Sequence, residues 1–138
     1  MTTQTTHRAA PIVRPNLLRY ALRADAMFSA ATGIICLAAA QPLATVIGIE
    51  PPLAFDGLGI VLLLYAAFLF LKTRQEQIDR RFAIVVIALN AIWVLDSVVV
   101  LVAGWLPLTG AGMWIIAIQA LVVATLAELQ FFGLRRTR

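Results

Sequence analysis

The chain has 138 residues, of which 62% are hydrophobic and 13% charged, whereas about 25% of the residues in a soluble domain are charged. So few charged side chains cannot cover a soluble globule of this size, and the composition predicts an integral membrane protein. The net charge of +4 does not indicate a nucleic-acid partner, because no basic groove or aromatic ladder accompanies it. Contact with the lipid bilayer and its anionic headgroups explains the charge better.

The chain begins with a polar segment, 1–15, which is rich in threonine and interrupted by Pro11 and Pro15. This composition predicts a disordered cytoplasmic tail. The first apolar segment follows at about 17–41 and should end before Pro42. Its uninterrupted part, 26–40, covers only about 22 Å as a helix, less than the ~30 Å hydrocarbon core. The span must therefore include 22–25, which places Arg23 and Asp25 at its inner edge.

Three more apolar segments predict helices at about 53–71, 82–104 and 109–132. Residues 16–134 then form one transmembrane domain, followed by a basic end at 135–138. The expected fold class is all-α, a four-transmembrane-helix up-down bundle. The connection 104–110 is very short, so the last two helices should be antiparallel neighbours.

The basic residues indicate the orientation of these helices. None of the eleven lies in the connections 41–52 or 104–110. Short loops rich in lysine and arginine stay in the cytoplasm, so both termini should lie there. The basic residues are Arg8, Arg14, Arg19, Arg23, Lys72, Arg74, Arg80, Arg81, Arg135, Arg136 and Arg138.

Ala38-Ala39-Ala40 resembles the small-residue cleavage site of a signal peptide. Cleavage there would remove the first helix and leave three. The segment before the apolar part would, however, be unusually long and would contain Asp25. Sequencing the N-terminus of the membrane-extracted protein distinguishes the two forms.

A weak internal repeat relates the two halves of the chain. Gln41-Pro42-Leu43-Ala44 resembles Leu106-Pro107-Leu108-Thr109, and a Gly-x-Gly follows each. In this register Asp25 corresponds to Asn90. The pattern is typical of two helical hairpins related by an axis normal to the membrane, although helix ends favour proline and glycine in any protein.

Polar side chains near the inner ends of the helices form the first candidate site. Asp25 and Ser29 share one face of the first helix, and Asn90 lies at a similar depth in the third, so we expect it to partner Asp25. Arg23 faces away from Asp25 and can reach Glu128, as an inner-edge charge pair. Such a layer either holds the bundle together or forms a polar site open to the cytoplasm.

The outer half of the third helix carries Trp93 and Asp96, and Gln119 lies at the same depth in the fourth. No Lys, Arg or His is available at the level of Asp96. Two interpretations stay open: a neutral Asp96 hydrogen-bonded to Gln119, Ser97 or a backbone carbonyl, or a site for a proton or a cationic ligand. The combined candidate ligand site is Asp25, Ser29, Asn90, Trp93, Asp96 and Gln119.

The residue inventory excludes several classes of chemistry. Cys36 is the only cysteine and His7 the only histidine, so a disulfide relay, bis-histidine haem ligation and a Ser/His/Asp triad are not expected. No residues have the spacing of a zinc site. We therefore expect no metal, no cofactor and no enzyme activity.

Three short motifs carry a resemblance: Leu22-Arg23-x-Asp25, Asn90-x-x-Trp93 and Ala127-Glu128-Leu129-Gln130. In these the chain resembles small uncharacterised bacterial four-helix membrane proteins, loosely DoxX-like. The resemblance implies a bacterial inner-membrane location and no particular activity. Size and helix count are also similar to those of small multidrug transporters, for which Asp25 would be the nearest match to the intramembrane carboxylate, but the residues around it depart from their pattern.

Three functions agree with these patterns. The first is an accessory or structural membrane protein whose polar residues hold the bundle. The second is a small proton- or cation-coupled transporter or channel subunit, acting as a homo-oligomer with Asp25 and Asp96 as coupling groups. The third is binding of a lipid or quinone in an apolar groove near Trp93. A cavity lined by Asp25, Asn90, Asp96 and Gln119 would favour transport, and a dry, fully paired interior the structural role.

Overall fold

The structure, a computed structural model, describes residues 17–136 and contains helices but no strands over that range. The helices are α1 (Leu17–Ala38), α2 (Ala40–Ile47), α3 (Leu53–Thr73), α4 (Arg80–Ala103) and α5 (Gly110–Arg136). All but α2 are long and apolar enough to cross a membrane, which confirms the predicted all-α, four-helix architecture. The predicted N-terminal tail lies outside the described residues.

The C-terminal end of the first helix differs from the prediction of one helix over 17–41. The helix breaks at Ala39, where φ is −130° and ψ is 32°, and α2 follows. Pro42 lies in the first turn of α2 and does not stop the helix, because backbone N–H groups in a first turn have no intrahelical partner to lose. Gly48, with φ of 89°, ends α2 and donates its N–H to the Ala44 carbonyl.

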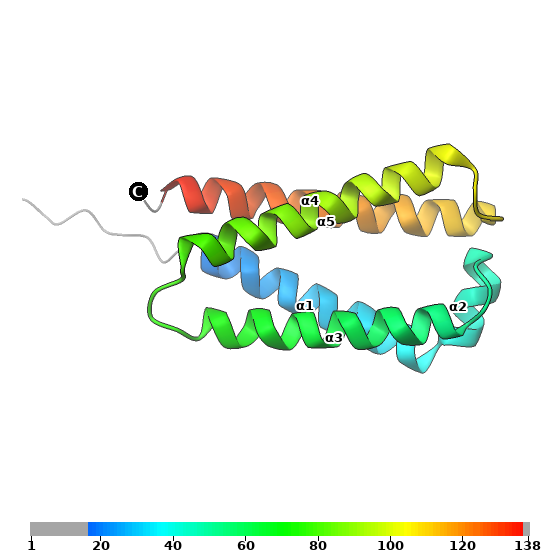
Figure 1. Cartoon of the computed structure of the whole chain (residues 1–138), viewed down its shortest axis with the longest axis horizontal. Helices are drawn as coiled ribbons and strands as arrows, with labels where there is room; N and C mark the ends of the chain where they lie inside the picture. Colours follow the sequence, from blue (N-terminus) through cyan, green and yellow to red (C-terminus); the bar gives the residue numbers. More distant parts are fainter. Residues whose placement is uncertain (1–16, 137–138) are drawn as a thin grey trace, which may run out of the picture.

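The two ends of the bundle differ in charge. Figure 1 shows the start of α1, the end of α5 and the connection 74–79 together at one end. We call this the basic end, because it and the two helical turns next to it carry all the described lysines and arginines. These are Arg19, Arg23, Lys72, Arg74, Arg80, Arg81, Arg135 and Arg136. The other end, formed by α2 and the connection 104–109, is called the α2 end.

The four long helices form two antiparallel hairpins, α1–α3 and α4–α5 (Figure 1). The hairpins meet mainly where α1 packs on α5, and α2 joins them at the α2 end. There the backbone N–H of Thr109 donates to the Ile47 carbonyl at 3.0 Å. By contrast α3 and α4, both described in full, have no Cα atoms within 8 Å of each other. The bundle is therefore closed on one side and open on the side between α3 and α4.

Glycines allow the close helix contacts. A Cβ atom on Gly59 of α3 would lie 2.8 Å from the Gly33 carbonyl oxygen of α1, and one on Gly133 of α5 would lie 2.5 Å from the Leu18 amide nitrogen of α1. Only a residue without a side chain permits such an approach, as is common where helices pack within a membrane.

The packed interior is small, and most large apolar side chains of the long helices are exposed. That distribution suits a protein whose surroundings are hydrocarbon, where exposing a leucine has no cost. One apolar cluster lies toward the basic end and a second joins α1, α2 and α3 near the α2 end. The first comprises Leu18, Leu22, Ala26, Leu69, Ala83, Val86 and Leu134, and the second Cys36, Ala44, Ile47 and Phe55.

Candidate functional site

Asp25 is the centre of a buried hydrogen-bond network. Its Oδ2 accepts from Asn90 Nδ2 at 2.7 Å and from Gln130 Nε2 at 2.8 Å. The Tyr65 hydroxyl lies 3.1 Å from the same oxygen and 3.3 Å from Asn90 Oδ1, and donates its single proton to one of them. Ser29 Oγ donates to Asp25 Oδ1 at 3.4 Å. The residue pair predicted from depth, Asp25 and Asn90, is thus in direct contact.

This network joins all four long helices, because Asp25 comes from α1, Tyr65 from α3, Asn90 from α4 and Gln130 from α5. Asp25 is 1% exposed and Gln130 is fully buried. In hydrocarbon a polar group without a partner costs several kcal/mol. Each of these side chains is therefore held in place by the others, and the network determines how the two hairpins meet.

Tyr65 and Gln130 were not among the predicted site residues, although the repeat contained the signal for them. Asp25 and Asn90 are 65 residues apart, and Tyr65 and Gln130 are separated by the same number. The four members are therefore two pairs of equivalent positions in the two hairpins. Extending the repeat register to α3 and α5, the second and fourth long helices of the bundle, would have identified both.

A second polar cluster connects α4 to α5, nearer the α2 end. The Trp93 indole N–H donates to Gln119 Oε1 at 2.8 Å, and Gln119 Nε2 donates to Ser97 Oγ at 3.0 Å. Ser97 Oγ in turn donates to the Trp93 carbonyl at 2.8 Å. These bonds place Trp93 and Gln119 together, as their predicted depths require, and they fix the orientation of the indole ring.

Asp96 differs from the other predicted site residues. Its side chain is exposed, and within residues 17–136 its carboxylate has neither a hydrogen bond nor an ion-pair partner. The expected contacts with Gln119 or Ser97 are absent from this described region, because those two side chains bond to each other. Asp96 instead lies at the edge of a cavity.

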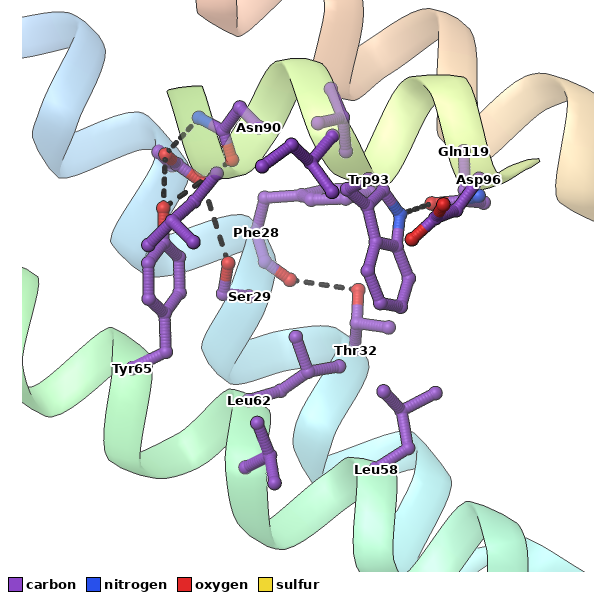
Figure 2. Close-up of a pocket in the computed structure, with 15 residues that line it drawn as sticks. Phe28, Ser29, Thr32, Leu58, Leu62, Tyr65, Asn90, Trp93, Asp96 and Gln119 are labelled. Carbon is purple, nitrogen blue, oxygen red and sulfur yellow. Dashed lines mark hydrogen bonds between the residues drawn. The ribbon is translucent and has the colours of Figure 1, made fainter. Parts of the chain in front are cut away.

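This cavity lies between α3 and α4, with α1 and α5 behind it, and has a volume of about 290 Å³. We call it the cleft. Figure 2 shows Tyr65 and Asn90 at one end and Trp93, Asp96 and Gln119 at the other, with Leu62 and Phe28 between them. Its lining is mostly apolar, and all six residues of the predicted ligand site contribute to it. They are Asp25, Ser29, Asn90, Trp93, Asp96 and Gln119.

The predicted inner-edge charge pair is not formed. Within the described chain no ion pair joins Arg23 to Glu128; Glu128 is exposed, and Arg23 Nη2 lies 3.5 Å from the Thr73 carbonyl oxygen. Arg19 donates to the carbonyls of Thr73, Gln75 and Glu76. Both arginines are attracted to the end of α3 because the last carbonyls of a helix lack intrahelical partners and carry partial negative charge.

Comparisons with known proteins found no relative of this chain. No protein-family model matches the chain, and no curated protein or solved structure is significantly similar to it. Among the described residues, no three His, Cys, Asp or Glu side chains form a group that could hold a metal ion.

Proposed function

We propose that this protein is a multi-pass membrane protein that binds a small, membrane-dissolved molecule in the cleft between α3 and α4. The resemblance to small bacterial four-helix membrane proteins makes the bacterial inner membrane the expected bilayer. The basic end would lie in the cytoplasm, because lysine and arginine concentrate in cytoplasmic loops. The single observation that carries the proposal is the open side of the bundle, where a cavity of about 290 Å³ is close to the lower limit of small-molecule sites, about 300 Å³.

The position of the cleft favours a ligand that arrives through the bilayer. Its walls are formed by exposed apolar side chains of the two separated helices, among them Val61 of α3 and Ile92 of α4. A molecule already dissolved in the hydrocarbon can pass between these walls without crossing a polar surface. Polar groups at the two ends of the cleft would then orient it.

The open side of the bundle coincides with a difference in side-chain size between the two halves of the repeat. In the repeat register Gly133 of α5 corresponds to Phe68 of α3. Gly133 lets α5 touch the Leu18 backbone of α1, whereas the ring of Phe68 packs edge-on against Phe82 of α4, with the ring centroids 5.6 Å apart. α3 thus carries a bulky ring at the position where α5 has a glycine, and the interface equivalent to the close α1–α5 contact is open.

A structural, accessory role is the second candidate, and the Asp25 network favours it. All four members of that network are paired with one another, as expected of residues that hold helices together. The two roles are compatible, because they belong to different parts of the bundle. The Asp25 network organises the bundle, and the cleft beside it provides the binding site.

Binding can be measured with the fluorescence of Trp93. The chain has three tryptophans, and Trp105 and Trp114 are exposed outside the cleft. A Trp105→Phe/Trp114→Phe variant in phosphatidylcholine nanodiscs leaves Trp93 as the only indole. Titration with the neutral nitroxide TEMPO, a contact quencher that dissolves in lipid, should give saturable quenching above the linear collisional background.

A matched pair of variants locates the quencher. Ile92→Phe adds volume to the cleft wall and should abolish the saturable phase. Leu95→Phe makes a similar change on an exposed residue of the same helix that does not line the cleft, and should leave binding unchanged. Purely linear quenching, or equal effects of the two variants, would rule out the cleft as a binding site.

A further inference from the structure

The charged side chains that line the cleft are all negative. Two carboxylates line it, Asp25 and Asp96. The lysines and arginines of the described chain all belong to the basic end, and none is among the lining residues. The oxygens of Asp25 already accept hydrogen bonds from neighbouring side chains. Those of Asp96 accept none within residues 17–136, so Asp96 is the group in the cleft that still needs a partner.

A lone carboxylate at this depth is unfavourable unless something compensates for it. Asp96 lies about 24 Å along α4 from Arg80, and about 10 Å from the end of the helix at Ala103, at 1.5 Å per residue. An acidic residue within a membrane span costs about 2.5–3.5 kcal/mol on insertion scales, and such residues usually have a partner or a function. Because the described chain supplies no cation at this level, the partner would have to come with the ligand.

The neighbouring aromatic residue suits the same ligand chemistry. The Trp93 indole N–H is bonded to Gln119, and Ser97 ties both residues together. With its N–H occupied, the ring offers the ligand its π-face rather than a hydrogen-bond donor. Figure 2 shows the ring extending from α4 into the cleft with Asp96 beside it. An aromatic face attracts an organic cation, most strongly for tryptophan and away from water.

We propose that the cleft selects organic cations, with the ammonium group of the ligand placed between the Asp96 carboxylate and the Trp93 ring. The apolar part of the ligand lies toward Leu62 and Phe28, which line the middle of the cleft. This inference rests on the proposed function, since it names the class of molecule that the cleft takes. The ligand is small, amphipathic and singly charged, because the lining is mostly apolar and Asp96 is its one carboxylate without a hydrogen-bond partner within residues 17–136.

The test compares three nitroxides that share one ring and differ in charge. TEMPO is neutral, 4-amino-TEMPO carries an ammonium group at neutral pH, and 4-carboxy-TEMPO carries a carboxylate. Each is titrated against the single-tryptophan protein in nanodiscs of zwitterionic phosphatidylcholine. The ammonium form should bind about tenfold more tightly than the neutral form, and the carboxylate form should not bind measurably.

The charge of Asp96 is then removed by Asp96→Asn, which keeps the size of the side chain. The preference for 4-amino-TEMPO over TEMPO should disappear, while the affinity for neutral TEMPO stays within about twofold. Asp56→Asn is the matched control: Asp56 lies in the first turn of α3, near the α2 end, and does not line the cleft. Asp56→Asn changes the net charge by the same amount as Asp96→Asn and leaves the partitioning of the nitroxides into lipid unaffected. The preference for 4-amino-TEMPO over TEMPO should therefore persist.

The outcomes separate this inference from the proposed function. If all three nitroxides bind saturably with equal affinity, or if Asp96→Asn keeps the preference, cation selection by Asp96 is overturned and the cleft remains a binding site. If none binds saturably, the proposed function fails as well. A melting curve for each variant shows that the fold is intact, which is expected because Asp96 makes no hydrogen bond in the described structure.

Discussion

Asp25 and Asp96 are both acidic residues within membrane spans, yet their surroundings differ. Asp25 is 1% exposed and is surrounded by donors from α1, α3, α4 and α5. Asp96 is exposed at the edge of the cleft and has no partner within 17–136. Removing the first should therefore damage the fold, whereas removing the second should affect only what the cleft binds.

Asp25→Ala should lower the free energy of unfolding by about 3 kcal/mol or more, because the amides of Asn90 and Gln130 would lose their acceptor while still buried. Tyr65→Phe removes one hydroxyl donor and should cost about 0.5–1.5 kcal/mol. Asp96→Asn should not lower the free energy of unfolding by more than about 0.5 kcal/mol, because Asp96 has no partner to lose within residues 17–136. The measurement is reversible unfolding by dodecyl sulfate in mixed micelles. Equal stabilities for the two aspartate variants would contradict the assignment of Asp25 as the organising residue.

Among the helices, α1 and α4 occupy equivalent places in the repeat but have different neighbours. α1 packs on both α3 and α5, whereas α4 packs closely only on α5. The difference lies in side-chain size at the crossing points. Gly33, Gly59 and Gly133 let α1 approach its neighbours closely, whereas between α3 and α4 two bulky rings, Phe68 and Phe82, meet edge-on.

Gly133→Ala should destabilise the bundle by about 1–3 kcal/mol, because the new methyl group would lie 2.5 Å from the Leu18 amide nitrogen and the helices must separate. Gly57→Ala is the control on another helix: nothing lies within 4 Å of its added Cβ. Alanine there should be neutral or stabilise by up to about 1 kcal/mol. Thermal unfolding in detergent compares the two, and a harmless Gly133→Ala would show that the close α1–α5 contact is not required.

For the molecule as a whole, the positions of the charges and the fold agree. The helices that the hydropathy pattern predicts bring three separate basic segments to one end of the bundle (Figure 1). Neither α2 nor the connection 104–109, at the other end, contains a lysine or an arginine. This segregation is the basis for proposing that the basic end faces the cytoplasm.

Labelling of single cysteines tests that orientation. In a Cys36→Ala background, a cysteine at Leu106 in the outer connection should react with a membrane-impermeant maleimide in intact cells. A cysteine at Gln77, in the connection 74–79, should react only after the cells are permeabilised. The native Cys36 is buried in α1, so the unmodified protein serves as an unreactive control. The reverse pattern would invert the proposed topology.

The sequence by itself predicted the properties that depend on how deep each residue lies in the membrane. Hydropathy and charge determined four spans, the shared end of the basic segments and the common level of Asp25 and Asn90. It was less accurate at Ala39, where a local break in the helix made α2, and at Arg23, which lies near the end of α3 instead of pairing with Glu128. Those details depend on backbone conformation and on which carbonyls lack partners.

The tertiary structure decided how the helices are arranged around one another. In a membrane, the side chains facing lipid are as apolar as those facing a neighbouring helix, so hydropathy does not tell the two faces apart. Only the packing shows that α5 lies against α1 while α3 and α4 stand apart. That arrangement brings Tyr65 and Gln130 into contact with Asp25 and places Asp96 at the edge of the cleft. The depth of a residue in the membrane follows from its position along the chain. The neighbours of a helix depend instead on how the surfaces of two helices fit together.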